Sequence, residues 1–370
     1  MNKPLLDLRY DAPEPPLQLE RIFRFQQRLF GEMSAALVAL ATFLGDRLGF
    51  FGALAESGPV TSANFASRQK TCPQMTAEWL RVMACAGYVT YEPRDQTYTL
   101  PPEHAIVLAN DGGPMCIAGG VQQLGGFAEQ LPTLIAAFRD GGGVPQGAYG
   151  NDLWEGMERL SASWFEHELV DAWLAALPDV QDSLRAGGRV ADVGCGSGRA
   201  LICLAKAFPA SRFVGYDAFN TSVERASRNA LNAGVADRVS FEVRDVMKGI
   251  PAEFDLVTAF DSLHDLPDPA AGLRAIARGA KKDGTLLVLE LSAGENVAEE
   301  SGPMGVVLHA TKLFYNLPVA LSAFGTALGT TAFPETYMRS LCRNAGLAFV
   351  RTLPVRNPLH KLYVIKNQNY

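Results

Sequence analysis

The sequence has few of the features that mark secreted, metal-binding or nucleic-acid-binding proteins. Its 370 residues include six cysteines and no C-x-x-C pair, so neither a zinc site nor a disulfide framework is expected. A formal net charge of −6 gives no electrostatic reason to expect a nucleic acid or an anionic membrane as partner. Residues 1–18 are polar and proline-rich and lack the apolar core of a signal peptide. We therefore expect a cytoplasmic protein with reduced thiols.

Long uninterrupted apolar stretches are also scarce. The longest, residues 305–333, is interrupted by Lys312, Asn316 and Pro318, so it predicts helices that line a pocket rather than a membrane span. Hydrophobic residues make up 48% of the chain, which indicates a globular protein with a large core and room for two domains.

What the sequence does contain is a glycine turn between a predicted strand, residues 189–193, and a predicted helix, residues 200–208. The strand closes with Asp192 and is followed by glycines at alternate positions: Gly194, Gly196 and Gly198. Glycines let the backbone turn tightly and lie close to a ligand. The third glycine of a dinucleotide fingerprint would stand where Arg199 is, and no phosphate-binding lysine accompanies the turn, so a polyphosphate ligand is not favoured.

Two further acids follow the next two predicted strands. Asp217 closes the strand over residues 212–216, where a carboxylate can accept two hydrogen bonds from a ribose diol. Asp245 closes the strand over residues 239–244, where it could accept from an adenine amino group. The alternative is that all three acids only cap helices. The spacing favours an adenosine that carries a cationic sulfonium.

These motifs resemble those of the class I S-adenosylmethionine-dependent methyltransferases. The resemblance implies an α/β fold: a Rossmann-like, doubly wound sheet whose last strand is antiparallel. Strands near residues 254–260 and 285–291 would continue the sheet, and residues 348–354 and 360–366 predict a final antiparallel hairpin. The resemblance also implies S-adenosylmethionine as cofactor, held by eight residues: Asp192, Gly194, Gly196, Gly198, Asp217, Asp245, Val246 and Phe260.

The N-terminal part predicts a mainly helical winged-helix domain. Helices are expected over residues 17–31, 34–55, 62–69 and 75–86, and two strands over 88–92 and 97–100. DNA binding is disfavoured because the recognition helix offers one base, Arg81, beside Glu78. A winged helix before a methyltransferase sheet resembles the plant-type and bacterial small-molecule O-methyltransferases. The resemblance implies that this part pairs two subunits; mere packing on the catalytic domain is the alternative.

A glycine-rich connector joins the two parts. Residues 105–150 hold four glycine clusters around one expected helix, residues 127–138, so the segment either hugs its neighbours or moves as a lid. Residues 152–174 predict a helix whose aromatic stripe belongs to the core or to a substrate wall. We expect three regions: a winged-helix domain over 1–108, a connector over 109–178 and a catalytic domain over 179–370.

A histidine just past the fourth strand is the predicted catalytic group. Leu263-His264-Asp265 resembles the tripeptide of the plant-type O-methyltransferases, in which the histidine is the general base. The resemblance implies two flanking glutamates, matched by Glu290 and loosely by Glu335. The sequence departs from that family after the tripeptide, where Leu266 replaces the usual tryptophan.

The sequence therefore predicts methyl transfer to a small, partly apolar acceptor, at a hydroxyl, with His264 as base. Carbon, nitrogen or carboxylate acceptors stay open, as does a winged-helix regulator that senses S-adenosylmethionine. In the stretch after the fifth strand, His309 or Lys312 either touches the acceptor or is ordinary helix polarity.

Overall fold

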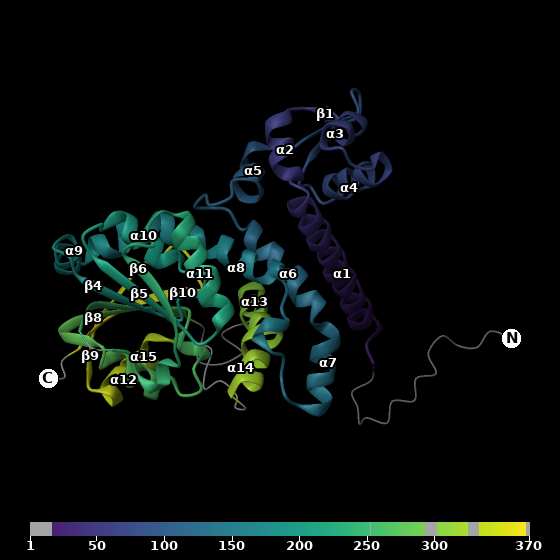
Figure 1. Ribbon diagram of the computed structural model, residues 1–370. Helices are drawn as coiled ribbons and strands as arrows, with labels where there is room; N and C mark the ends of the chain where they lie inside the picture. Colours follow the sequence, from purple (N-terminus) through teal and green to yellow (C-terminus); the bar gives the residue numbers. More distant parts are fainter. Residues whose placement is uncertain (1–16, 252, 293–301, 325–332, 368–370) are drawn as a thin grey trace.

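The computed structural model describes residues 17–251, 253–292, 302–324 and 333–367 (Figure 1). An N-terminal helical part leads into a seven-stranded sheet with helices on both faces. Both expected parts are present, and the fold is the α/β class that the sequence predicts.

The N-terminal part is a winged helix with one more strand than predicted. Its sheet has the order β1-β3-β2, because Val60 and Thr61 pair with Tyr98 and Thr97 of the wing. A core around Phe50, Phe65 and Trp79 fills the space between the helices. The elements are α1 (Leu19–Arg47), α2 (Phe50–Ser57), β1 (Val60–Thr61), α3 (Ser62–Gln69), α4 (Pro73–Cys85), β2 (Thr90–Glu92), β3 (Thr97–Thr99) and α5 (Pro102–Leu108).

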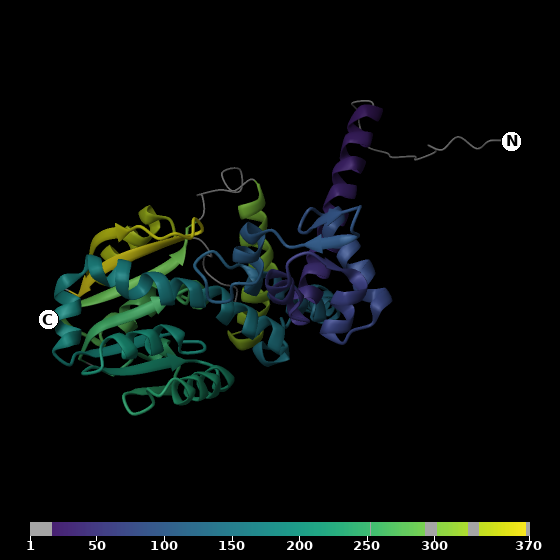
Figure 2. The same cartoon turned by 90° about the horizontal axis from the view of Figure 1, so that it is seen from above.

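The first helix differs from the prediction. Residues 17–31 and 34–55 were expected to form two helices, but α1 runs unbroken through Gly31, and the break comes at Gly49 (φ 69°). A methyl group on Gly31 would meet nothing within 4 Å, so this glycine sits on an open helix face. Among the described residues, α1 has the length and hydropathy of a membrane-spanning helix, with 11% of its most apolar window buried. Figures 1 and 2 show its N-terminal half standing clear of the body.

The connector is more helical than predicted. Two helices, α6 (Ala118–Glu129) and α7 (Leu131–Asp140), replace the single helix expected over 127–138. The break falls at Gln130, because Pro132 favours a helix start. The connector continues through η1 (Gln146–Ala148), α8 (Asn151–Trp164), the π-helical η2 (Phe165–Trp173) and η3 (Leu174–Ala176), and α9 (Pro178–Arg185) leads into the catalytic domain.

Close packing of α6 on α8 accounts for part of the glycine density. A methyl group on Gly119 would lie 2.5 Å from the Gly156 carbonyl oxygen, and one on Gly126 would lie 2.7 Å from Leu153 Cβ. These glycines therefore let two helices pack closely, which agrees with the first of the two predicted roles, close packing on neighbouring elements. A lid role for the segment stays a prediction.

The catalytic-domain sheet has the order β6-β5-β4-β7-β8-β10-β9. The first five strands in this order are parallel, and β10 pairs antiparallel with both β8 and β9. The predicted reversed last strand is thus confirmed. The strands are β4 (Arg189–Val193), β5 (Arg212–Asp217), β6 (Val239–Val243), β7 (Phe254–Phe260), β8 (Ala280–Leu291), β9 (Leu347–Leu353) and β10 (His360–Asn367).

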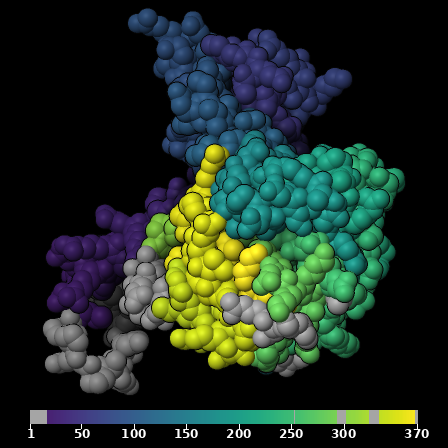
Figure 3. Space-filling model, turned by 90° about the vertical axis from the view of Figure 1, so that its left-hand side faces the viewer, coloured from purple at the N-terminus to yellow at the C-terminus, as the bar shows by residue number. Residues whose placement is uncertain are grey.

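Helices cover both faces of this sheet. On one face, α9, α10 (Arg199–Ala207) and α11 (Asn220–Asn232) bury side chains against η2. On the other face, α12 (Pro269–Ala277) and α15 (Glu335–Ala345) form a second core. Figure 3 shows the C-terminal residues, in yellow, at the surface between these two layers. Parallel strands buried on both faces place ligands at their carboxyl ends.

The long apolar stretch forms helices, as predicted, in its described part. It gives α13 (Pro303–Thr311), the π-helical η6 (Lys312–Asn316) and α14 (Leu317–Phe324); residues 325–332 lie outside the described residues. Tyr315 and Val319 pack with Val144, Tyr149 and other connector side chains. The stretch therefore lies against the connector beside the carboxyl edge of the sheet.

Candidate active site

The glycine turn lies at the carboxyl end of β4. The backbone N–H groups of Gly194 and Cys195 both donate to the Tyr216 carbonyl, at 2.8 and 3.1 Å. Gly194, Gly196 and Gly198 have φ angles of 67°, 51° and 78°, which L side chains rarely adopt. A methyl group on Gly194 would lie 2.4 Å from Ser262 Cβ, whereas one on Gly196 would meet nothing within 4 Å. The turn therefore presents bare backbone to open space.

Two buried carboxylates flank this turn. Asp192 accepts from Thr258 Oγ1 at 2.6 Å, and Asp217 accepts from the backbone N–H groups of Gly196 and Phe219, both at 3.0 Å. Burial raises the pKa of Asp192 to about 7, with the nearby Asp217 adding to the shift. Burial also raises the pKa of Asp217, although its two backbone hydrogen bonds oppose this. Neighbouring anions with few donors suit a ligand rich in donors.

Three further residues were predicted to bind the cofactor, and in the structure each contacts other parts of the protein. Asp245 accepts from the Met247 N–H at 3.0 Å and caps η4 (Val246–Lys248), which is the capping role weighed as its alternative. Val246 is buried in the core beside α12. Phe260 packs its ring on Phe165 and Trp173 at centroid distances of 5.4 and 5.8 Å. The aromatic stripe of η2 thus belongs to the core here.

The imidazole of His264 is held by Glu290. Nδ1 of His264 lies 2.7 Å from Oε2 of Glu290, and Glu290 Oε1 accepts from the backbone N–H groups of Ser262, Leu263 and His264. Both side chains are buried. They meet because η5 (Leu263–Asp265) follows β7 and Glu290 closes the neighbouring strand β8. The predicted contact between His264 and Glu290 is present.

Three carboxylates control the charge of this imidazole. Burial lowers the pKa of His264, but the charges of Glu290, Asp265 and Asp261 outweigh burial and raise it to about 10. Nε2 of His264 lies 3.4 Å from Asn316 Nδ2, and Asn316 in turn donates to Asp265 at 3.0 Å. The ring is therefore a stronger base than a free histidine.

Glu335 does not take the place predicted for it. Its carboxylate starts α15, accepts from Arg339 one turn later at 2.6 Å and from Thr352 of β9 at 2.8 Å. The negative charge on the second side of the imidazole comes from Asp265 instead, 3.5 Å from His264 Nε2.

Several residues at this edge were missed by the sequence analysis. Asn316 was named only as a polar break in an apolar stretch, and η6 turns it toward His264; π-helical turns often mark functional sites. Asp261 and Ser262 stand in the same turn as His264, which could have flagged them. His360 could not be found this way, because only the antiparallel pairing of β10 with β8 brings it near.

The donor atoms of Asp261, His264 and Glu290 lie within 4.8 Å of one another, a grouping that a cation could use. Hydrogen bonds explain this grouping without a cation, since Glu290 Oε1 accepts from three backbone N–H groups and Oε2 accepts from the imidazole. We interpret the group as a hydrogen-bonded acid–base cluster.

An aromatic cluster lies next to Asn316. Tyr315 contacts Tyr149 and Trp154 edge-on at centroid distances of 5.3 and 5.8 Å, and Phe314 stacks on Phe127 at 5.8 Å. Tyr149 donates to the Phe314 carbonyl at 2.5 Å, which ties the connector to η6. His309 lies in α13 and Lys312 opens η6; contact of either with the acceptor stays a prediction.

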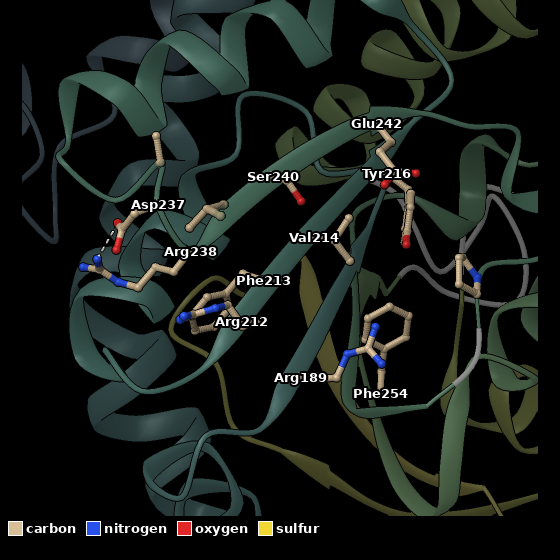
Figure 4. Close-up of a pocket in the computed structure, with 13 residues that line it drawn as sticks. Arg189, Arg212, Phe213, Val214, Tyr216, Asp237, Arg238, Ser240, Glu242 and Phe254 are labelled. Carbon is tan, nitrogen blue, oxygen red and sulfur yellow. Dashed lines mark hydrogen bonds and ion pairs between the residues drawn. The ribbon is translucent and has the colours of Figure 1, made fainter.

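A separate hollow lies at the opposite edge of the sheet (Figure 4). Its volume is about 360 Å³, and its walls include the first residues of four parallel strands: Arg189, Arg212, Val239 and Phe254. Among the described residues between β6 and β7, only the short η4 is helical. The hollow contains none of the predicted site residues.

Comparison with family models identifies both parts of the chain. A model described as a methyltransferase domain matches residues 184–314. A model described as an Rv2258c-like winged HTH domain matches residues 36–110. A ubiquinone biosynthesis O-methyltransferase of Paracidovorax citrulli is 36% identical over 198 residues, which are 52% of this chain and 75% of that protein. The chain belongs to the methyltransferase family.

Two other relatives of this methyltransferase carry different names. A 27-O-demethylrifamycin SV methyltransferase of Amycolatopsis mediterranei is 42% identical over 121 residues, 32% of this chain and 42% of that protein. An aclacinomycin 10-hydroxylase of Streptomyces purpurascens is 28% identical over 246 residues, 63% of this chain and 64% of that protein. The match thus spans under half of the first of these relatives and just under two thirds of the second.

Solved structures with the same fold cover almost the whole methyltransferase. Human N-acetylserotonin methyltransferase, in a complex with S-adenosylmethionine, has a TM-score of 0.62 at 18% identity and covers 97% of this chain. A calicheamicin-biosynthesis methyltransferase with bound S-adenosylhomocysteine has a TM-score of 0.63 at 20% identity, covers 93% of this chain and is itself covered to 98%. At these identities the likeness shows the fold alone.

Proposed function

We propose that this methyltransferase moves the methyl group of S-adenosylmethionine to a hydroxyl of a small acceptor, with His264 as general base. One observation carries the proposal. A buried imidazole, bonded to Glu290 at 2.7 Å, stands directly after β7, and β7 pairs with β4, whose end forms the glycine turn. Base and nucleoside site are thus neighbours at one sheet edge.

The residues at the turn fit the cofactor. Asp192 and Asp217 are buried acceptors, Gly196 faces open space, and the hydroxyl of Ser262, next to Gly194, is buried without a hydrogen-bond partner among the described residues. Asp217 would accept from the ribose diol, and Asp192 and Ser262 would bind toward the methionine half. Asp245, Val246 and Phe260 would complete the site. When bound, the cofactor supplies an electrophilic methyl carbon on a cationic sulfonium.

The chain then has to align the acceptor and remove its proton. Glu290 fixes the ring of His264 with Nδ1–H toward the carboxylate, which leaves Nε2 to take the hydroxyl proton. The raised pKa of His264 means that the ring is protonated at neutral pH in the ligand-free site. The positive charge of the cofactor would oppose this shift, because it repels a proton on His264.

The acceptor is small and partly apolar. The aromatic cluster of Tyr149, Trp154 and Tyr315 adjoins Asn316, and its rings suit a flat, apolar body next to the base. The O-methyltransferase relatives support a hydroxyl acceptor in a biosynthetic reaction.

The proposal is tested by turnover with His264→Gln and Glu290→Gln. Purified enzyme is incubated with S-adenosylmethionine and a panel of phenols, hydroxyacids and amines, and S-adenosylhomocysteine is quantified. His264→Gln should lower turnover about a hundredfold or more while calorimetry shows unchanged cofactor affinity. Unaltered turnover in His264→Gln would remove it as the base.

Two other outcomes of that assay would redirect the proposal. Methylated amines or carbon acceptors would leave His264 as an orienting group. Cofactor binding with oxygenated rather than methylated products would follow the hydroxylase relative. A regulatory role is less well supported, because Arg81 of α4 is ion-paired with Glu78; sequence-specific gel shifts with genomic fragments would reverse that judgement.

We also propose that a second copy of the chain covers α1. Its surface carries large apolar side chains: Phe23, Phe25, Phe30, Leu37 and Leu44 are all at least 45% exposed. An apolar face of this size in water marks an association surface. The described cysteines are all free thiols, which supports a cytoplasmic site for the reaction.

A further inference from the structure

A second imidazole–carboxylate pair stands beside the first. Nε2 of His360 lies 2.9 Å from the carboxylate of Asp261. Asp261 directly follows β7, and His360 opens β10, which runs antiparallel and so begins at the edge where β8 ends. A donor atom of Asp261 lies within 4.8 Å of those of His264 and Glu290. Two imidazoles therefore share one carboxylate neighbour.

The backbone holds Asp261 in an unfavourable conformation. Its φ is 50° although it is not glycine, and its N–H donates to the Leu289 carbonyl at 2.9 Å. Residues kept in this region cluster at functional sites, because only a surrounding structure that demands the geometry retains them. The turn thus keeps the Asp261 carboxylate on His360 and close to His264.

The pair of His360 and Asp261 is largely buried, but some polar atoms in and beside it have no hydrogen bond. His360 is 7% exposed, and its ring lies 4.8 Å from that of Trp164 on α8. Yet His360 Nδ1 and Ser262 Oγ are buried without hydrogen-bond partners among the described residues. A pair that served folding alone would be expected to satisfy these atoms.

We propose that His360 is a positioning residue which, through Asp261, sets the negative charge next to His264. The inference rests on the proposed role of His264. The N–H of His360 withdraws part of the Asp261 charge from the catalytic pair. The other groups that face His264 are Glu290 on β8, Asp265 on η5 and the neutral amide of Asn316 on η6. Among these neighbours of His264, Asp261 is the one whose negative charge is altered by a residue on a further element, His360 on β10.

Two substitutions in this one pair should act in opposite directions. Asp261→Asn removes a negative charge beside His264, so His264 should titrate about one pH unit lower. His360→Phe keeps a ring against Trp164 but leaves the Asp261 charge unshared, so His264 should titrate higher. His360→Gln restores an N–H donor and should return the midpoint toward that of the wild type.

The measurement is a side-chain NMR titration of the ligand-free enzyme, in which only five histidines contribute. The titration needs no methyl acceptor, so it tests the inference independently of turnover. Once an acceptor is known, the pH profiles of kcat should shift in the same order among the variants. Shifts in opposite directions, with wild-type thermal unfolding, would support the proposal. Equal shifts, shifts of one sign or unchanged midpoints in folded variants would overturn it.

Discussion

At the scale of single residues, the site contains a group of buried acids. Their burial lowers the stability of the folded enzyme, and their oxygen atoms are available for function. Asp192, Asp217 and Glu290 are each at most 8% exposed. Burial disfavours the charged carboxylate. Glu290 accepts four hydrogen bonds from protein groups, whereas Asp217 accepts two from backbone N–H groups and Asp192 accepts one from Thr258. Asp192 and Asp217 therefore have more room to accept from a ligand.

Replacing Asp217 by Ala should weaken S-adenosylmethionine binding by about 1–3 kcal/mol, since two ribose hydroxyls lose their acceptor. Calorimetry measures this directly. Glu242→Ala is a matched control, because this acid also lies on the sheet but lines the hollow at the opposite edge. An Asp217→Ala enzyme with wild-type affinity would contradict the ribose assignment.

Replacing Asp192 by Asn should stabilise the ligand-free enzyme at high pH. The folded-state pKa of Asp192, about 7, lies above its ordinary value of 3.8. Its contribution to stability is therefore complete below pH 3.8 and is lost as the pH rises through about 7. Thermal unfolding should show a higher Tm for Asp192→Asn at pH 8 and a smaller gain at pH 5.

Asp192→Asn should also bind S-adenosylmethionine more weakly, so this variant gains thermal stability while it loses cofactor affinity. A Tm that falls at both pH values would mean that the carboxylate is a structural requirement. Thr258 Oγ1, which donates to Asp192 at 2.6 Å, can still donate to the amide oxygen of Asn.

At the scale of elements, the strands were easier to predict than the helices. The residues from 189 to 260 alternate short apolar runs with helical patterns, and β4, β5 and β7 begin where expected. Within the connector, helices were predicted near α7 and α8, but α6 was missed because its glycines suggested a loop. A glycine in a helix costs little when another helix packs on it, and local sequence does not reveal that contact.

The contact between α6 and α8 gives a matched pair of variants. Gly119→Ala places a methyl group 2.5 Å from the Gly156 carbonyl oxygen, whereas Gly120→Ala meets nothing closer than 3.9 Å. The first should destabilise by about 1–3 kcal/mol. The second should be neutral or stabilise by up to about 1 kcal/mol. Urea unfolding measures both, and equal effects would contradict the packing role of Gly119.

The candidate site was predictable only in part, for a physical reason. Asp192, Asp217 and Glu290 lie at the ends of strands and His264 follows β7 closely, and parallel strands end at one edge. Asn316 and His360 come from a π-helical turn and an antiparallel strand, whose positions depend on tertiary packing. Glu335 was misplaced because a helix start fixed it to its own neighbours.

At the scale of the whole molecule, the first part of α1 is left uncovered, since residues 19–37 are all exposed. Phe25 and Phe30 are 63% and 73% exposed. A double Phe25→Asp, Phe30→Asp variant should shift light-scattering mass from two copies to one. Leu231→Asp, on α11 and 69% exposed, is the control that should leave the mass unchanged. A wild-type enzyme of one-copy mass would contradict the dimer.

The most direct test of the central claim is a crystal structure of the enzyme with S-adenosylhomocysteine. We expect the ribose hydroxyls on Asp217, the nucleoside across the glycine turn of Gly194 to Gly198, and the sulfur facing His264 Nε2. A nucleoside bound in the hollow lined by Arg189 and Arg212, or a sulfur turned away from the imidazole, would contradict the account.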